Sequence, residues 1–249
     1  MLQMSGLTYS PAVKDPVSLA LLKAGEGGIA FFDVDHTLVQ GSTAFHCTGI
    51  LRREGILTRR DMVRIAVAHL RHHLGILDYE RVYAMGVRPF VGTSFDGCCA
   101  ILDEAFRDCV KPHIHVDGIA CMQAHRAAGE AVVLLSASSA WLLERFSQVA
   151  PIDGVVAFRQ HVRDGRFIDD WDRPIPYGVN KRTLAEAYAA KAGIGLDACA
   201  FYSDSTSDQP LLEAVGRPVA VNPDPRLRWT AWRRGWPVVQ WRRTMGSRT

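Results

Sequence analysis

Three features are scarce in this chain of 249 residues: long apolar runs, paired cysteines and, near the carboxyl end, acidic side chains. No stretch reaches the roughly 18 apolar residues that a membrane-spanning helix needs. The first 28 residues lack the basic start and long apolar segment of a signal peptide, and the apolar run at residues 17–22 is too short for one. We therefore expect a cytoplasmic protein.

The six cysteines show no CxxC pairing and are too sparse for a disulfide scaffold. We expect reduced, mostly buried thiols and no structural zinc site. The sequence contains no internal repeat and no low-complexity segment. Its length allows one large domain or a core with a smaller insert.

What the chain does contain is a buried-looking strand that ends in two carboxylates. Residues 29–32 are a continuous apolar run, as expected for a central parallel strand covered on both faces. If the extended geometry persists, Asp33 and Asp35 point to the same side. Adjacent carboxylates repel unless a cation or a proton lies between them, and Mg²⁺ prefers such oxygen ligands. Taken alone, the segment from Asp33 to Thr37 fits an Asp-rich loop that caps a turn equally well.

Residues 43–110 have apolar positions at helical spacing and no intervening strand. A helical block of this length, directly after the first strand, predicts a small separate domain or lid. We therefore expect a core of residues 1–41 and 112–249 and a helical cap of residues 42–111. A short helix is also expected over residues 17–24.

The second half of the chain has the alternation of strands and helices that is typical of a parallel sheet. Around the turn at Asp164 and Gly165, residues 154–158 and 165–168 predict a small hairpin. Further strands are expected at residues 131–135, 198–202 and 218–221, with an edge strand at residues 237–240.

Polar residues follow each of the main strands, so a right-handed βαβ arrangement would bring them to one crevice. Ser136 ends one strand, and Asp204 and Asp208 follow another. Lys181 opens a helix between them. Each has a simpler interpretation: a serine can cap the next helix, and a lysine at a helix start is usually solvated.

These motifs, in this order, resemble those of the haloacid dehalogenase (HAD) superfamily, subfamily IB, the phosphoserine phosphatase-like branch. The resemblance covers residues 29–221 and implies an α/β fold, a Rossmann-like parallel sheet core with an inserted helical C1 cap domain. It also implies a Mg²⁺-dependent phosphatase that hydrolyses a small phosphomonoester through an aspartyl phosphate. The second motif-one aspartate, Asp35, argues against carbon–halogen cleavage. The four motifs correspond to Asp33 through Thr37, Ser136, Lys181, and Asp204 with Asp208.

The resemblance implies a role for each of these residues. Asp33 would attack phosphorus, and Asp35 would act as general acid and then as general base. The phosphoryl oxygens would be bound by Thr37, Ser136 and Lys181. The magnesium ligands would be Asp33, Asp35 through its main-chain carbonyl, Asp204, and Asp208 through water.

Two departures from the family's pattern argue against serine phosphate as the substrate. Ser42 stands where phosphoserine phosphatases carry a glutamate for the substrate amino group, although Glu54 could substitute for it. Motif four lacks its usual glycines and asparagine. The alternatives are therefore phosphoserine phosphatase proper, a lipid- or membrane-associated phosphatase or phosphotransferase, and a non-catalytic binding protein. Monomer and homodimer both remain open.

Arginines are concentrated in the cap and in the carboxyl-terminal tail, which has seven arginines and no acidic residue from Arg226 onward. We favour solvated cap arginines, with one or two binding an anionic substrate group as the alternative. In the tail we favour tryptophans packed on the core and arginines in water. Anionic lipid is the alternative partner, and no nucleic acid is expected. The tail tryptophans are Trp229, Trp232, Trp236 and Trp241.

Overall fold

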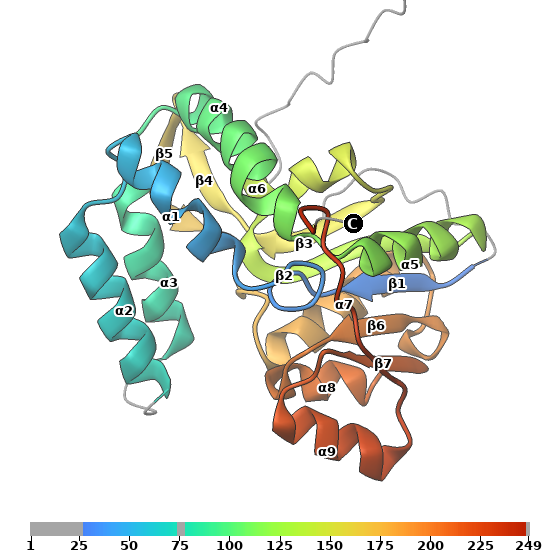
Figure 1. The fold of residues 1–249 in the computed structure, drawn as a ribbon. Helices are drawn as coiled ribbons and strands as arrows, with labels where there is room; N and C mark the ends of the chain where they lie inside the picture. The colour runs from blue at the N-terminus through green and yellow to red at the C-terminus, as the bar shows by residue number, and fades with distance from the viewer. Residues whose placement is uncertain (1–26, 74–77, 248–249) are drawn as a thin grey trace, which may run out of the picture.

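The computed structural model describes residues 27–73 and 78–247. It consists of a sheet with helices on both faces and a group of helices beyond one end of the sheet (Figure 1). The helix predicted over residues 17–24 lies outside the described residues. In the described part of the chain, no helix has both the length and the apolar character needed to cross a bilayer.

The main sheet has the strand order β3-β2-β1-β6-β7-β8, and every neighbouring pair is parallel. Its central strand, β1, is the apolar run that the sequence predicts, and all four of its residues are buried. This confirms the predicted α/β class and the predicted burial of this strand, and the structure places β1 between β2 and β6, the strands that carry the other polar residues. The strands are β1 Ile29–Phe32, β2 Ala131–Ser139, β3 Gly154–Phe158, β6 Ala200–Ser203, β7 Arg217–Val221 and β8 Val238–Val239.

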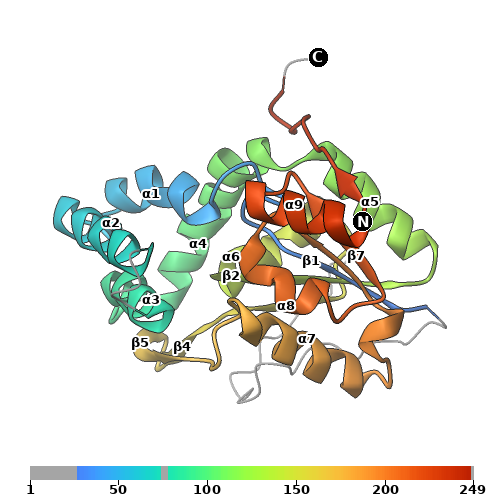
Figure 2. The same cartoon turned by 90° about the horizontal axis from the view of Figure 1, so that it is seen from below.

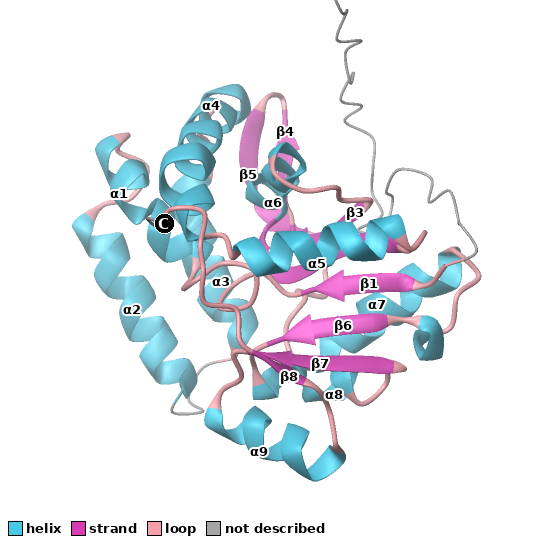
Figure 3. Cartoon of the chain, turned by 45° about the vertical axis from the view of Figure 1, so that its right-hand side comes forward, coloured by secondary structure: helices cyan, strands magenta, loops and turns pink. Residues whose placement is uncertain are grey.

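Side chains alternate between the two faces of β1, so each face has its own core. Phe32 packs in the cluster that includes Met122, whereas Phe31 packs in the cluster that includes Leu184. Figure 3 shows α5 in front of the sheet and α7 behind it. Helices over the sheet are α5 Val116–Ala127, α6 Ala140–Leu143, α7 Val179–Lys191, α8 Gln209–Leu212 and α9 Pro225–Arg234.

The predicted hairpin is wrong in one strand. Residues 154–158 form β3, which pairs in parallel with β2 at the edge of the main sheet. The hairpin joins β4 Gln160–Arg163 to β5 Arg166–Trp171 in antiparallel register. The reason is burial, because β3 is apolar and almost wholly buried, as a strand of the main sheet must be.

The segment between β1 and β2 is helical, as predicted. These helices lie beyond the ends of β1 and β6 toward which the strand arrows point (Figures 1 and 3). They are α1 Thr43–Arg53, α2 Arg59–His73, α3 Tyr79–Val87 and α4 Phe95–Ala105. The six cysteines, all of them described, are free, as expected.

The carboxyl-terminal tail departs from the interpretation favoured above. Trp241 is buried and Trp236 is partly buried, in agreement with packing on the core. Trp229 and Trp232, however, are 57% and 77% exposed. They lie on the outer side of α9, whose inner side is already occupied by Leu227 and Ala231.

Candidate active site

Asp33 lies at the centre of the site. It directly follows β1, and its main-chain N–H donates to the Tyr202 carbonyl of β6 at 3.0 Å. The residue is only 6% exposed, and Lys181 Nζ donates to its Oδ1 at 2.8 Å. Burial raises the pKa of Asp33 to about 6 even though the Lys181 charge pulls it down.

Lys181 comes from the first turn of α7 and reaches back across the strand ends. Its ammonium group also donates to Asp208 Oδ2 at 2.7 Å, and the residue is only 4% exposed. Burial opposes its charge, but attraction to Asp208 and Asp33 outweighs burial and raises its pKa. The solvated lysine of the simpler interpretation is therefore wrong. Gly178, at φ +56°, provides the left-handed backbone just before this helix.

The loop after β6 supplies two more carboxylates. Asp208 is buried and accepts a second hydrogen bond, from Ser203 Oγ at 2.7 Å. Asp204 accepts from Thr37 Oγ1 at 3.1 Å, and the Asp204 main-chain N–H donates to the same hydroxyl oxygen at 3.0 Å. Burial and then the nearby Asp33 charge raise the pKa of Asp204 to about 8.

Asp35 occupies a different part of the site from Asp33. The strand ends at Phe32 and a turn follows, in which Val39 N–H donates to the Val34 carbonyl at 2.9 Å. The extended geometry assumed from the sequence therefore does not persist. Asp35 instead accepts from Thr43 N–H, at the start of α1, at 2.8 Å and from Ser138 Oγ at 2.7 Å.

Ser138 and Thr43 were not among the site residues predicted from the sequence. Their hydroxyl groups lie 3.0 Å apart, so the two residues that donate to Asp35 also contact each other. Ser136 is buried, and its Oγ accepts from the Ser138 main-chain N–H at 3.2 Å. The spacing of Ser136 and Ser138, two positions apart at a strand end, was a usable signal. For Thr43 the sequence carried none, because its contact depends on where α1 begins.

The donor set at this edge fits a magnesium ion. Lys181 contacts Oδ1 of Asp33, whereas Asp33 Oδ2 and Asp204 Oδ1 both lie near the Thr37 hydroxyl, at 3.5 and 3.1 Å. Burial first, and then the charges of neighbouring carboxylates, raise the pKa of both groups, so a bound cation would favour their ionised forms. In residues 27–73 and 78–247, no three His, Cys, Asp or Glu side chains form a metal cage. Mg²⁺ is usually held by only one or two carboxylates, with water and phosphate completing its shell.

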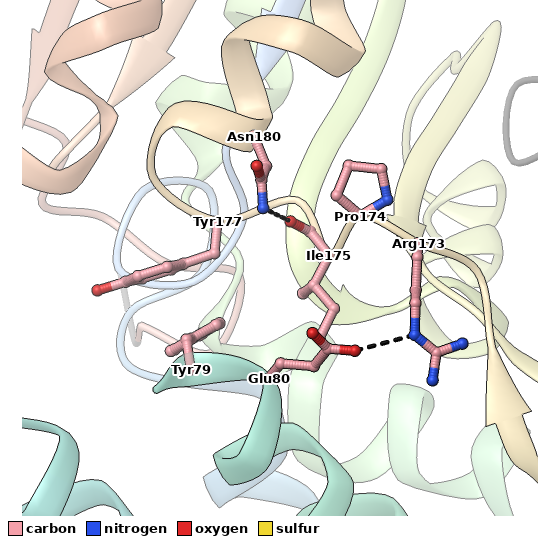
Figure 4. A pocket seen from close by; sticks show the side chains of 7 residues that line it. All are labelled: Tyr79, Glu80, Arg173, Pro174, Ile175, Tyr177 and Asn180. Atoms are coloured by element: carbon pink, nitrogen blue, oxygen red, sulfur yellow. Dashed lines mark hydrogen bonds and ion pairs between the residues drawn. The ribbon is translucent and has the colours of Figure 1, made fainter. Parts of the chain in front are cut away.

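A pocket of about 350 Å³ lies between α3 and the segment that leads into α7 (Figure 4). The rings of Tyr79 and Tyr177 stack there with centroids 3.5 Å apart, and Arg173 Nε pairs with Glu80 Oε1 at 2.9 Å. One turn further along α3, the Tyr83 hydroxyl donates to the main-chain carbonyl of Ala137, just after Ser136. The pocket is lined by Tyr79, Glu80, Arg173, Pro174, Ile175, Tyr177 and Asn180.

The substitute acid suggested for the Ser42 position lies too far away. Thr43 at the start of α1 contacts Asp35, whereas Glu54 follows the far end of this helix and pairs with Arg53. At 1.5 Å per residue, about 16 Å separates the two along the helix axis. The nine arginines of residues 42–111 are exposed, in agreement with a solvated surface: Arg52, Arg53, Arg59, Arg60, Arg64, Arg71, Arg81, Arg88 and Arg107.

Comparison with known proteins identifies the family. A profile of the haloacid dehalogenase-like hydrolases matches residues 30–213. The "Inhibition of morphological differentiation protein" of Streptomyces azureus is 33% identical, over 86% of this chain and 78% of the relative. The phosphoserine phosphatase SerB1 of Mycobacterium tuberculosis is 32% identical, over 86% of this chain and 70% of its own. The chain therefore belongs to the haloacid dehalogenase-like hydrolase family, as the resemblance implied.

Solved structures agree with this assignment. A Bordetella pertussis protein of unknown function superposes with a TM-score of 0.78 at 28% identity, over 86% of this chain and 98% of its own. A substrate-bound phosphoserine phosphatase superposes with a TM-score of 0.61 at 17% identity, over 82% and 90% of the two chains, which speaks for the fold alone. The chain is thus an enzyme of a hydrolase family in which the named relatives include phosphatases.

Proposed function

We propose that this chain is a Mg²⁺-dependent phosphatase that hydrolyses a small phosphomonoester through a phosphorylated Asp33. The observation that carries the proposal is the convergence of Asp33 with Lys181, Thr37 and Asp204 in one buried cluster. A second carboxylate, Asp35, is held beside it by separate hydrogen bonds. A nucleophile and a general acid/base that are held by different hydrogen-bond partners suit a reaction in two steps.

In the first step, an Asp33 carboxylate oxygen attacks phosphorus, and the bond from phosphorus to the leaving oxygen breaks. Asp35 gives its proton to that oxygen, so that an alcohol leaves. Thr37, Lys181 and the Ser136 hydroxyl hold the phosphoryl oxygens, where charge must be stabilised. Ser138 and Thr43 keep the Asp35 carboxyl directed at the leaving oxygen. Ser138, in β2, binds one of its oxygens, and Thr43, at the start of α1, binds the other.

In the second step, water attacks phosphorus while Asp35 accepts its proton, and the bond to Asp33 breaks to release phosphate. Bound by Asp33 and Asp204, Mg²⁺ would neutralise charge on the transferring group. Asp208 acts through Lys181, which it holds in place with help from Ser203. This role differs from the water-mediated metal contact expected from the resemblance.

The pocket in Figure 4 supports a substrate other than phosphoserine. No acidic side chain takes the place of the missing glutamate from the start of α1 in the described structure, where Ser42 precedes Thr43. The α3 side of the site instead presents Tyr79, stacked on Tyr177 four residues before Lys181. We propose that the leaving group lies against these two rings. A ring-bearing or apolar alcohol fits such a surface better than a small zwitterion. In this proposal residues 42–111 act as the cap that selects the substrate, in a cytoplasmic enzyme.

The test is phosphate release from a panel that includes phosphoserine, histidinol phosphate, sugar phosphates, nucleotides, lysophosphatidate and an aryl phosphate, with Mg²⁺ or with EDTA. We expect Mg²⁺-dependent release that favours substrates with ring-bearing alcohols. The Asp33→Asn variant should lose turnover while keeping its melting temperature. Retained activity in this variant refutes the assignment of Asp33.

The panel also separates the alternatives. Preference for phosphoserine would contradict the proposed leaving-group surface, and preference for lysophosphatidate would favour a lipid phosphatase. Phosphate transfer to an added alcohol would indicate a phosphotransferase. No release from any member would favour a binding protein.

A further inference from the structure

The outer side of α9 presents two tryptophans to solvent beside a group of arginines. Trp229 and Trp232 are more exposed than buried, although a large aromatic side chain is normally well covered in a folded protein. Helix α9 forms the outer edge of the molecule on the side away from α5 (Figures 1 and 3). In Figure 2 it faces the viewer, well separated from α2 and α3.

Helix geometry places these side chains on one surface. At 100° per residue, the buried Leu227 and Ala231 define the inner side of α9, and Trp229 lies almost opposite them. Trp232 lies on one flank of Trp229. Two arginines, Arg226 and Arg233, lie beside Trp229 on this outer side, and Arg228 lies on the flank next to Trp232; all three are exposed. We call these five residues, the two tryptophans and the three arginines, the Arg/Trp surface.

The charge of this surface is not balanced by ion pairs in the described part of the protein. Over residues 27–73 and 78–247, no carboxylate forms an ion pair with any of its three arginines, whereas Arg234, on the inner flank, pairs with Glu213 at 2.6 Å. The guanidinium of Arg233 lies over the Trp229 ring, 4.7 Å from its centroid. The surface thus combines uncompensated positive charge with amphipathic rings.

We propose that the Arg/Trp surface docks this enzyme on an anionic lipid bilayer. Tryptophan prefers the interface between headgroups and acyl chains, and arginines beside it attract anionic headgroups. A short, convex helix side suits a nearly planar surface. Nucleic acid fits less well, because single strands bind in grooves where bases stack on open aromatic faces, and Arg233 covers one face of Trp229.

The docking surface is directly joined to the active-site loop. Asp224, the N-cap of α9, accepts from the main-chain N–H groups of Arg226 and Leu227 at 2.8 Å. The same carboxylate accepts from Thr206 N–H at 2.7 Å, and Asp224 N–H donates to the Asp204 carbonyl at 2.8 Å. The orientation of α9 on a membrane would therefore set the orientation of the catalytic edge.

Vesicle co-sedimentation of the full-length protein tests this proposal without any measurement of activity. The probes are vesicles of phosphatidylcholine alone and of phosphatidylcholine mixed with phosphatidylglycerol, at low and at high salt. We expect salt-sensitive binding to the anionic vesicles only, with a blue shift of tryptophan emission. The double variant Trp229→Ser/Trp232→Ser should lose the blue shift and most of the binding.

A charge variant with a matched control separates this surface from general basicity. Each arginine removed from it should weaken partitioning about fivefold, so Arg226→Gln/Arg228→Gln/Arg233→Gln should weaken it roughly a hundredfold. Three exposed arginines of the cap region serve as the control, and their removal should change partitioning much less. The control variant is Arg52→Gln/Arg59→Gln/Arg60→Gln.

Several outcomes would overturn the proposal. One is equal loss of binding in the control variant, which would mean that net charge alone drives the attraction. Another is oligonucleotide binding without vesicle binding. A third is a protein dimer, in sedimentation velocity, that dissociates when Trp229 and Trp232 are replaced. Activity toward a soluble substrate should be the same in the variants of the Arg/Trp surface, and an unchanged melting temperature checks the folding of the control variant.

Discussion

Replacement of Lys181 by methionine is the most informative single change, because this residue holds two buried carboxylates together. Its ammonium lies 2.8 Å from Asp33 and 2.7 Å from Asp208. Methionine has similar length and no charge, so the variant leaves both carboxylates without their cation and changes little volume. The adjacent Arg182 is exposed on the same helix, and Arg182→Met is the matched control.

The size of the effect follows from burial. Loss of one partner of a buried ion pair costs about 3–5 kcal/mol. For a chain of this size, 1 kcal/mol corresponds to a change of about 2–4 °C in melting temperature. We therefore expect Lys181→Met to lower the melting temperature by about 10 °C at pH 8 in EDTA, and Arg182→Met by no more than about 2 °C.

The pH dependence of this loss tests its electrostatic origin. Without Lys181, the pKa of Asp33 should rise above its present value of about 6. The folded state then keeps a proton that the unfolded state releases, so the stability of the variant falls as pH rises. Thermal melts followed by circular dichroism at about pH 5 and pH 8 should show the larger loss at the higher pH. Equal losses at both pH values, or a loss no larger than that of Arg182→Met, would refute the reasoning.

Three further predictions concern the rest of the site. Ser138→Ala should lower kcat about tenfold with little change in KM, because Asp35 loses a 2.7 Å hydrogen bond that positions it. Ser139 makes no side-chain capping bond, so Ser139→Ala should leave kcat nearly unchanged, and similar kinetics for the two variants would contradict the role of Ser138. Mg²⁺ should raise the melting temperature more at about pH 9 than at pH 6, because the pKa of Asp204 is about 8 in the folded state and 3.8 in the unfolded state. The stability of the metal-free protein therefore falls as pH rises from 3.8 to about 8, and below about pH 8 protons compete with the cation for Asp204. Fluorimetry against an EDTA reference checks this, and equal shifts at the two pH values would count against a cation at Asp204. Tyr177→Ala should raise KM about fivefold with kcat nearly unchanged, because one ring of the stacked pair is lost. Steady-state kinetics on the preferred substrate measure this, and an unchanged KM would mean that the leaving group binds elsewhere.

The parts of the fold that follow from local pattern were predictable. The apolar run before Asp33 predicts a strand buried on both faces, and β1 is that strand. The periodic apolar residues after Gly41 predict helices, which the structure contains. The hairpin prediction failed because residues 154–158 and the following turn are adjacent in sequence, whereas pairing with β2 depends on the whole sheet.

The tail shows the same division. The sequence after Pro225 shows that arginine and tryptophan are interleaved, but the spacing of the tryptophans does not indicate which of their rings face the core. The first turns of α9 bury Leu227 and Ala231 instead, which leaves Trp229 and Trp232 outside. Trp241 is buried because the chain after β8 returns over α5, where its ring lies against Gly118.

The sequence by itself determined the family, the central strand and the identity of the carboxylates that follow it, because each motif and each apolar run is a local pattern and the motifs occur in a fixed order along the chain. Only the tertiary structure decided how those groups are paired. Lys181 and Asp33 are 148 positions apart, and Ser138 and Asp35 are 103 apart. Contacts over such separations are specified by the packing of the sheet and its helices, so neither motif spacing nor composition could assign them.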